Sequence, residues 1–366
     1  MHPISYTTKR IRLSITEKCN LRCTYCFEEN KNYRTIDLET AKRIVEEELT
    51  KPSSFELVIF DLFGGEPFLE FDLLRELCES TWARSWNRKY LFWTTTNGTL
   101  VHGDIQKWVY ENRHRLYCGL SLDGPREVHN RNRTNSFDKI DINFFKNTWP
   151  DRPVRSVIAE NSIQDLYESV VFLQEQFKRV KVRLAFGVAW DYIGVEEILE
   201  DQLTKLVQYY TDHPEYEVCS MLDIDFTQLR NAAPEQCCGV GFNHCAYDVD
   251  GTAYPCAQFQ SLCREYNLAA EDVWSLNFKN RQNYLPQKCK DCCLKDICKT
   301  CYAFCYVHRD DSIGKCGTFK LMVYKAAQLR LNRLAQKGDS MTDKDKQIYD
   351  ICRGICVRME ENNWTV

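Results

Sequence analysis

The sequence lacks the features of a membrane, secreted or nucleic-acid-binding protein. No apolar run in the 366 residues approaches the roughly 18 residues that a membrane span needs. The N-terminus lacks the basic and then apolar layout of a signal peptide. The net charge of −4 offers no electrostatic basis for binding nucleic acid. The sequence therefore predicts a soluble, cytoplasmic protein that binds neither a membrane nor nucleic acid.

What the chain does have in excess is cysteine, with 20 residues. A small secreted domain would use such a number for disulfides. This chain is long and 44% hydrophobic, so it can build a core without cross-links. In a reducing compartment, clustered thiols more often bind metal or carry out redox chemistry. We therefore expect metal sites rather than a disulfide scaffold.

Short apolar runs alternate with amphipathic segments through the first half of the chain. The predicted strands are 9–16, 56–63, 90–96, 115–122, 153–159 and 181–188. The predicted helices are 37–50, which Asp37 would cap, and 69–86, 103–113, 137–148, 162–177 and 195–210. Repeated strand–helix units predict an α/β fold with a parallel sheet, open or curled into part of a barrel. Its chemistry would lie at the C-terminal ends of the strands.

The character of the sequence changes after residue 215. Helical periodicity fades, cysteines become frequent, and residues 246–254 read as a small hairpin. A module of this kind is stabilised by metal rather than by a core. Helical patterns return over 318–336 and from about residue 343. The predicted domains are a barrel over 1–215, a cysteine-rich module over 216–320 and a helical segment over 321–366.

Three cysteines follow the first predicted strand with the spacing Cys-x3-Cys-x2-Cys: Cys19, Cys23 and Cys26. Three thiolates hold three irons of a [4Fe–4S] cube and leave the fourth open to an outside ligand. A three-cysteine zinc site with water, or plain core cysteines, are the alternatives. The position directly after a strand and the motifs that follow argue against both.

The loop and the segments after the next three strands resemble those of radical S-adenosylmethionine (SAM) enzymes. The family's Gly-Gly-Glu-Pro segment is matched after the second strand, an Asn-Gly turn follows the third, and "SLDGP" with His129 and an arginine follows the fourth. The resemblance implies a [4Fe–4S] cluster on the three cysteines and SAM contacts by Gly64, Gly65, Glu66, Pro67, Asn97, Ser121, Asp123 and Arg133. In that resemblance the glycines let the ligand approach closely, and the arginine pairs with the SAM carboxylate.

The second cysteine region resembles the SPASM domain, an extension that holds two auxiliary [4Fe–4S] clusters. By order in the motif, the first auxiliary cluster would be held by Cys238, Cys245, Cys256 and Cys301. The second would be held by Cys289, Cys292, Cys298 and Cys316. The spacing between Cys298 and Cys301 is one residue shorter than usual, and Cys237, Cys293 or Cys305 could replace an assigned ligand. A zinc ribbon is the alternative for 289–301, but it leaves the "CGVG…DGTAYPC" half unexplained.

The resemblance implies a partial (β/α)6 TIM-type barrel, a SPASM domain and C-terminal helices, with three clusters and SAM as cofactors. It also implies an anaerobic oxidoreductase that modifies a ribosomally synthesised precursor peptide, with a cysteine thioether as the favoured crosslink. A carbon–carbon crosslinking or epimerising maturase is the alternative. A sulfatase-maturase-like enzyme is less favoured, because Ala257 stands where those enzymes place an acidic residue.

Partners follow from the same resemblance. A flavodoxin- or ferredoxin-type protein would supply electrons. Because the first strand begins by about residue 9, we expect no N-terminal leader-binding module, so the leader would be read by the barrel, the C-terminal helices or a separate protein. A pure electron carrier and a zinc-stabilised interaction module are the alternatives from other classes. A pure electron carrier would not need the SAM motifs. A zinc-stabilised module would contain zinc, whereas three clusters would contain about twelve irons per chain, so metal analysis distinguishes the two.

Overall fold

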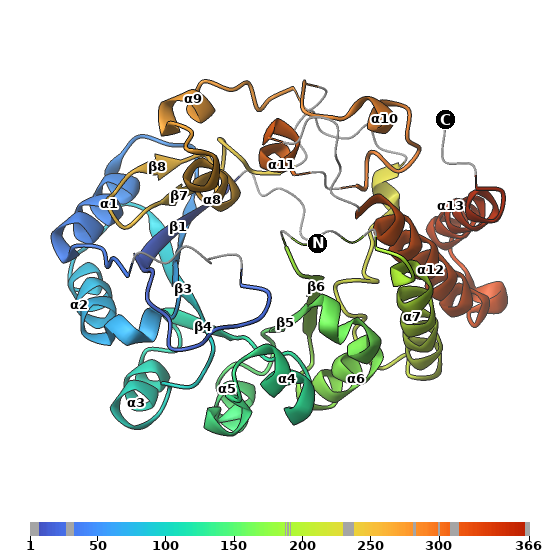
Figure 1. The fold of residues 1–366 in the computed structure, drawn as a ribbon, viewed down its shortest axis with the longest axis horizontal. Coiled ribbons are helices and arrows are strands. Elements are labelled where there is room, and N and C mark those ends of the chain that lie inside the picture. The colour runs from blue at the N-terminus through green and yellow to red at the C-terminus, as the bar shows by residue number, and fades with distance from the viewer. Residues whose placement is uncertain are drawn as a thin grey trace.

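The chain is described from a computed structural model, which covers residues 7–26, 33–186, 188, 190, 192–229, 238–280, 283–298, 301–307 and 315–362. Strands alternate with helices through the first half, as predicted. The helices ring the strands on the outside, so that one face of the strands looks toward the centre of the molecule (Figure 1). The second half closes the ring on the side of β1.

The strands are β1 (Thr8–Thr16), β2 (Leu57–Gly64), β3 (Lys89–Thr96), β4 (Leu116–Leu120), β5 (Val154–Ile158), β6 (Val180–Leu184), β7 (His244–Tyr247) and β8 (Ala253–Tyr254). The main sheet has the order β4-β3-β2-β1-β7-β8, in which only the β7–β8 pair is antiparallel. β5 and β6 form a separate parallel pair. An isolated bridge between Ser121 and Arg155 links that pair to the end of β4.

The α/β class and the parallel strands are confirmed, but the sheet differs from six strands paired in one series. The predicted hairpin at 246–254 exists as β7 and β8, and β7 pairs in parallel with β1. A strand from the cysteine-rich segment thus becomes part of the barrel sheet. The pairing joins the predicted first and second domains through backbone hydrogen bonds, a link that local sequence patterns do not reveal.

The helices around the strands are α1 (Leu38–Thr50), α2 (Phe71–Trp82), α3 (Gly103–Glu111), α4 (Arg126–Asn132), α5 (Ile142–Thr148), α6 (Leu166–Gln176) and α7 (Val195–Asp212). The Asp37 carboxylate accepts the amide hydrogen of Thr40 at 3.0 Å, which confirms the predicted N-cap of α1. Leucine, isoleucine and valine side chains of these helices pack on the outer face of the strands. Strand residues that point to this face, such as Ile11, Phe60 and Phe92, are fully buried.

The second half of the chain is more helical than its sequence suggests. It contains α8 (Ala257–Tyr266), α9 (Ala270–Trp274), α10 (Gln287–Lys290), α11 (Tyr302–Val307), α12 (Lys315–Ala335) and α13 (Asp343–Glu360). α12 packs against α7 and α13, and the last two helices agree with the prediction. The four short helices were missed, because each stripe of apolar residues is too short to show a period. Phe259, Phe278 and Tyr302 pack there in a second, smaller core.

Among the residues that the structure describes, none of the helices combines the length and the apolar character needed to cross a membrane.

Candidate functional site

The cysteine loop runs from the end of β1 and is held from two sides. The Asn20 amide donates to the Thr99 hydroxyl at 2.8 Å, beyond β3. On the other side, the backbone N–H of Thr24 donates to Asn132 O at 3.0 Å, and that of Arg22 donates to Thr134 Oγ1 at 3.1 Å. These contacts fix the loop at the C-terminal edge of the sheet, where the parallel strands predicted the site.

The three predicted thiolates lie in this loop and influence one another. Cys19, Cys23 and Cys26 are each partly exposed. Burial, with smaller effects of Asp123 and of the neighbouring Cys26 and Cys19 thiols, raises the pKa of Cys23 to about 11, and Arg133 opposes the rise. The thiols are thus close neighbours on one short segment, with a cation beside them. That is a donor set suited to an iron–sulfur cluster, whose thiolates bind different irons and need not converge on one point.

Gly64 and Gly65 lie against the start of the cysteine loop. A Cβ at Gly64 would stand 2.0 Å from Thr16 O, and one at Gly65 would stand 2.1 Å from Lys18 O. The Gly65 N–H donates to Thr16 O at 2.9 Å. The backbone that leads into the cysteine loop therefore fills the space above these glycines, where we predicted a ligand. Glycine is required here so that β2 can hold that backbone closely.

The Glu66 carboxylate is 1% exposed and is surrounded by protein donors. It accepts from the Thr96 hydroxyl at 2.8 Å, the Asn97 N–H at 2.8 Å and the Phe68 N–H at 3.2 Å. Burial raises its pKa to about 7, against the lowering effect of these hydrogen bonds. The Asn97 side chain donates to Asn20 Oδ1 at 2.9 Å. Glu66 and Asn97 thus connect the ends of β2 and β3 to the cysteine loop, and Pro67 is buried at the start of a 3-10 turn.

Asp123 and Arg133 form the other wall of the site. Asp123 is fully buried, and Arg133 Nε lies 3.0 Å from its Oδ2. The Tyr25 hydroxyl, inside the cysteine loop, donates to the same oxygen at 2.6 Å. Tyr25 stands directly before Cys26, and the spacing of the cysteines gives no sign of this contact. Ser121, also predicted to contact SAM, lies at the end of β4 and bridges to β5 through Arg155.

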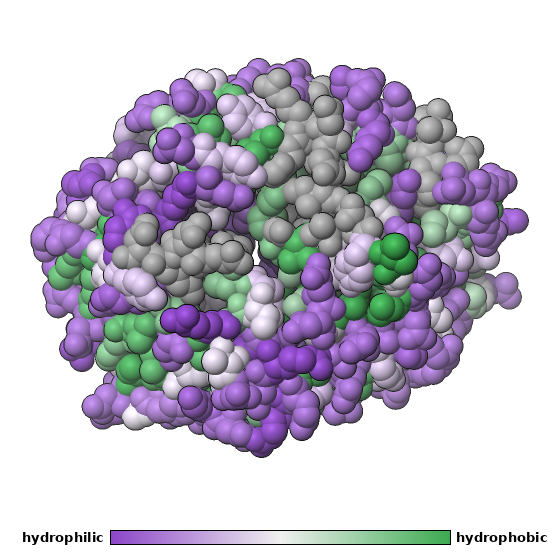
Figure 2. Space-filling view, in the orientation of Figure 1, coloured by the Kyte–Doolittle hydropathy of each residue, from purple (hydrophilic) through white to green (hydrophobic). Residues whose placement is uncertain are grey.

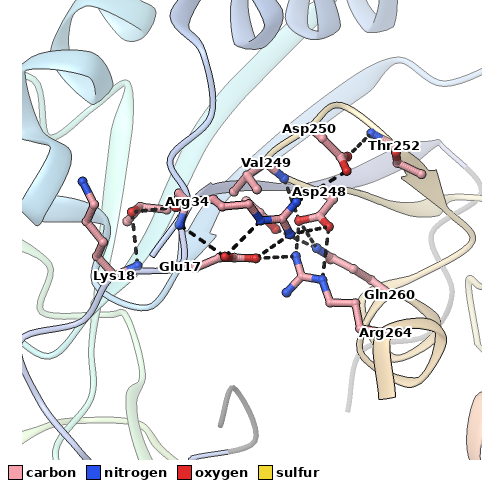
Figure 3. Close-up of polar contacts among 11 residues, drawn as sticks. Glu17, Lys18, Arg34, Asp248, Val249, Asp250, Thr252, Gln260 and Arg264 are labelled. Atoms are coloured by element: carbon pink, nitrogen blue, oxygen red, sulfur yellow. Dashed lines mark hydrogen bonds and ion pairs between the residues drawn. The ribbon is translucent and has the colours of Figure 1, made fainter. Parts of the chain in front are cut away.

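A buried polar network connects the start of the cysteine loop to the cysteine-rich half (Figure 3). Glu17 and Asp248 carry almost no exposed side-chain surface and face the same two arginines. Arg34 Nη2 lies 2.7 Å from Glu17 Oε1 and 3.4 Å from Asp248 Oδ2, and Arg264 pairs with both carboxylates. Gln260 of α8 donates to Ser14 of β1 at 3.0 Å and to Asp248 at 3.2 Å. Local sequence patterns gave no signal for this network.

The structure does not bring together all four cysteines predicted for the first auxiliary cluster. Cys245 pairs with Ile11 in the β1–β7 register and lies in the main core, near Lys9 and Glu48 on the side of α1. His244 pairs with Arg10 and points to the opposite, inner face. Because successive strand residues point to opposite faces, Cys245 is separated from the other three by the sheet itself.

The other three predicted ligands of that cluster lie around the second core. Cys238, Cys256 and Cys301 all pack against it. Burial raises the pKa of Cys256 to about 12; the Cys301 thiol adds to the rise, and Arg12 from the inner face of β1 opposes it. Cys305 is buried in α11, the helix that follows Cys301. Cys237 lies outside the described residues.

The cysteines predicted for the second auxiliary cluster come from the segment 289–298 and from the first turn of α12. The segment with Cys289, Cys292 and Cys298 turns back on itself, since Cys292 N–H donates to Cys289 O at 3.4 Å. Cys292 and Cys293 pack against the main core, and Lys320 of α12 is among the charges that act on Cys293. Cys316 is exposed in the first turn of α12. Within the described ranges, no three His, Cys, Asp or Glu side chains are grouped to hold a single metal ion.

Comparison with known proteins agrees with this arrangement. Residues 9–139 match a family model described as a 4Fe-4S single cluster domain. A cysteine-type anaerobic sulfatase-maturating enzyme of Clostridium novyi is 26% identical over 326 residues, which cover 78% of this chain and 85% of that enzyme. The corresponding enzyme of Clostridium perfringens strain 13 is 24% identical over 332 residues, or 80% of this chain and 88% of the relative.

Two groups of solved structures share the fold. The structure of anSMEcpe with bound AdoMet and the Cp18Cys peptide has a TM-score of 0.65 at 20% identity, covering 91% of this chain and 99% of that one. Streptococcus suis SuiB bound to its precursor peptide SuiA has a TM-score of 0.55 at 17% identity, covering 83% and 74%. The predicted cofactor classes, [4Fe–4S] clusters and SAM, agree with the matched domain and with the AdoMet in the first structure. The chain therefore has the radical SAM/SPASM-type fold.

Proposed function

We propose that this chain is a radical SAM maturase that oxidises a ribosomally synthesised peptide and joins two of its residues, with a cysteine thioether as the first candidate. The observation that carries the proposal is the pairing of β7 with β1. It puts Cys256 and its neighbours beside the same barrel whose strand ends carry the cysteine loop. A site for making a radical and a site for accepting an electron would then lie on the same side of the barrel sheet.

The residues present fit the cofactors of this fold. Cys19, Cys23 and Cys26 would hold the SAM-binding cluster, with Ser121, Asp123 and Arg133 beside SAM. Cys238, Cys256 and Cys301 would contribute to the first auxiliary cluster. The second would be held by Cys289, Cys292, Cys298 and Cys316. When bound, SAM and the reduced cluster supply a 5′-deoxyadenosyl radical that takes one hydrogen atom from the substrate, and the auxiliary clusters take up the remaining electron.

The protein residues contribute positioning and exclusion of water. Tyr25 and Arg133 hold the Asp123 carboxylate, which keeps this wall of the site rigid before any ligand binds. An arginine has five N–H donors, so Arg133 keeps donors for a carboxylate such as that of SAM. In a thioether-forming reaction the substrate loses the hydrogens of one S–H and one C–H bond as the S–C bond forms. A flavodoxin- or ferredoxin-type protein would supply the electron for SAM cleavage.

The second candidate is oxidation of a substrate cysteine to formylglycine. The similarity to sulfatase-maturating enzymes over most of both chains favours it. Ala257, the first residue of α8, argues against it. Sulfatase-maturating enzymes carry an acidic residue directly after the cysteine that aligns with Cys256. Epimerisation of a peptide residue is a third candidate, and it needs a thiol that returns a hydrogen atom to the substrate radical.

The experiment is anaerobic incubation of the iron-loaded enzyme with SAM, a reductant and a candidate precursor peptide, which is sought among short open reading frames near the gene. A thioether leaves the peptide two hydrogens lighter with its sulfur retained. Formylglycine formation removes the sulfur, and epimerisation in D2O adds one deuterium. A variant with alanine at Cys19, Cys23 and Cys26 should form no 5′-deoxyadenosine. If that variant still cleaves SAM, the proposed site is wrong.

A further inference from the structure

The inner face of the barrel strands carries a group of cationic side chains that the motifs do not explain. Paired residues of parallel strands point to the same face, and Arg155 pairs with Lys181 while Arg12 pairs with Asp61. The residues between them, such as Leu13 and Val182, point outward into the core. We call the following residues the inner-face cation cluster: Arg10, Arg12, Arg155, Lys181 and Arg183.

These cations act on one another. Burial, together with the charges of Arg183, Arg155 and Arg10, lowers the pKa of Lys181 to about 8. Burial and Arg155 lower the pKa of both Arg10 and Arg183 as well. Asp61 is the carboxylate that opposes these effects, with Oδ2 3.6 Å from Arg12 Nη2. One carboxylate leaves the cluster with a clear excess of positive charge.

Two buried polar atoms of this face have unused hydrogen-bonding capacity. Within the described residues, Arg155 Nε and Asp61 Oδ1 are buried and have no hydrogen-bond partner. Buried polar groups are nearly always paired in folded proteins, through protein, water or a bound molecule. Arg155 also lies against Gly119, where a Cβ would come within 3.3 Å of Nε. The glycine leaves room for the guanidinium at the end of β4.

The cluster lies between the two predicted chemical sites. Arg155 bridges to Ser121, at the strand end predicted to face SAM. Arg12 is close enough to Cys256 to act on its thiol. Arg10 and Arg183 are surrounded by protein on this inner face but keep solvent-accessible surface, so solvent reaches this face. The space-filling view shows a narrow gap near the centre of the molecule (Figure 2). A substrate oxidised between the two sites would pass these side chains.

We propose that the inner-face cation cluster binds the carboxylates of an acidic segment in the substrate peptide. The inference rests on the proposed function and names its substrate class: a peptide with aspartate or glutamate near the modified residue. Guanidinium groups suit this task because their planar N–H pairs match a carboxylate.

Neutralising the negative charge of an auxiliary cluster could explain Arg12 beside Cys256. It does not explain Lys181 and Arg183, whose described neighbours are arginines and Asp61.

The probes are two short fluorescein-labelled peptides, one of alternating glutamate and serine and the other with glutamine in place of glutamate. Binding to the iron-loaded enzyme with SAM is followed anaerobically by fluorescence anisotropy. We expect the glutamate peptide to bind at least roughly tenfold more tightly at low ionic strength, with the difference shrinking as salt is added. Equal binding of the two peptides would overturn the inference.

The test variants are Arg183→Gln and Lys181→Gln, and the matched control is Arg179→Gln. Arg179 stands directly before β6 but pairs with Glu217 on the exposed outside, its Nε 2.8 Å from Glu217 Oε2. Both test variants should weaken binding of the glutamate peptide severalfold at low salt, while the control should not. Circular dichroism and iron content check that each variant is folded. The inference fails if the control loses as much affinity as the test variants.

A second readout separates this inference from the proposed function. SAM cleavage to 5′-deoxyadenosine in the absence of peptide should be the same in Arg183→Gln and in the unaltered enzyme, because Arg183 is not among the predicted SAM contacts. SAM cleavage together with equal binding of both peptides defeats the acidic-substrate inference alone. An unaltered enzyme that binds the acidic peptide selectively but never cleaves SAM defeats the proposed function alone.

Discussion

Arg133 and Asp123 form a buried ion pair: Arg133 Nε lies 3.0 Å from Asp123 Oδ2, and Nη2 lies 3.1 Å from Oδ1. Both residues were predicted from sequence to contact SAM separately. In the structure they hold each other, and Tyr25 of the cysteine loop joins them through its hydroxyl. The pair thus connects the loop that would carry the cluster to the residues that would carry SAM.

Breaking this pair should be costly. Asp123→Asn leaves a buried guanidinium without its counter-charge, which costs about 3–5 kcal/mol of unfolding free energy. Anaerobic guanidinium denaturation measures it. The control is Arg131→Gln, two residues before Arg133, whose ion pair with Asp165 is partly exposed to solvent; it should cost less than about 1 kcal/mol. Equal costs in the two variants would contradict the importance of the Arg133–Asp123 pair.

Gly65→Ala should disturb the cysteine loop. The new Cβ would stand 2.1 Å from Lys18 O and 2.9 Å from Cys19 Cβ, so the backbone that leads into Cys19 must move. We expect a loss of visible iron–sulfur absorbance and of SAM-dependent 5′-deoxyadenosine formation. Gly354→Ala in α13 is the control: nothing lies within 4 Å of the added Cβ, and the variant should gain up to about 1 kcal/mol of helix stability. If Gly65→Ala kept its iron and its activity, the backbone at Lys18 and Cys19 could move aside without disturbing the cluster site.

Cys245 and Cys256 should behave differently on substitution. Cys256 packs with Cys301 near the inner face, whereas Cys245 lies across the sheet in the main core. Cys256→Ala should lower the iron content by about four atoms per chain and stop product formation. Cys245→Ser should keep the full iron content and lose only stability, through the buried hydroxyl. Loss of the same iron from Cys245→Ser would restore the ligand set expected from the motif.

The network around Arg264 gives a pH-dependent prediction. Hydrogen bonds with Arg34 and the charge of Arg264 hold the pKa of Glu17 below its ordinary value, against the effect of burial. Because the folded pKa is below the unfolded one, Glu17 stabilises the fold above about pH 4.5, and this contribution is lost as the pH falls through the lower folded pKa. Arg264→Met should therefore destabilise the enzyme more at pH 7 than at pH 4, as urea denaturation would measure.

The matched control for that experiment is Arg43→Gln. Arg43 pairs with Glu47 one helical turn away, and both side chains are about half exposed. Such a pair contributes only about 0.5 kcal/mol, so the control should show little pH-dependent loss between the same two pH values. A loss in Arg264→Met that does not change with pH would mean that Glu17 keeps its low pKa without Arg264.

Much of the barrel could be predicted because its signals are local. The N-cap at Asp37 and the strand–helix alternation depend on residues within a few positions of one another. The short helices after Cys256 could not be predicted, since α9 and α10 are shorter than two helical turns and their packing partners come from distant segments.

The sequence by itself determined which chemistry the chain can carry, because cysteine spacing and the turns after strands are short-range properties. Tertiary structure alone decided where these residues point. Cys245 and His244 are neighbours in sequence, yet the pairing of β7 with β1 sends them to opposite faces of the sheet. In the same way, cations from strands far apart in the chain become one cluster only when those strands close around a common interior. Strand alternation is a local rule, but which face becomes the inside depends on the neighbours that the whole fold supplies.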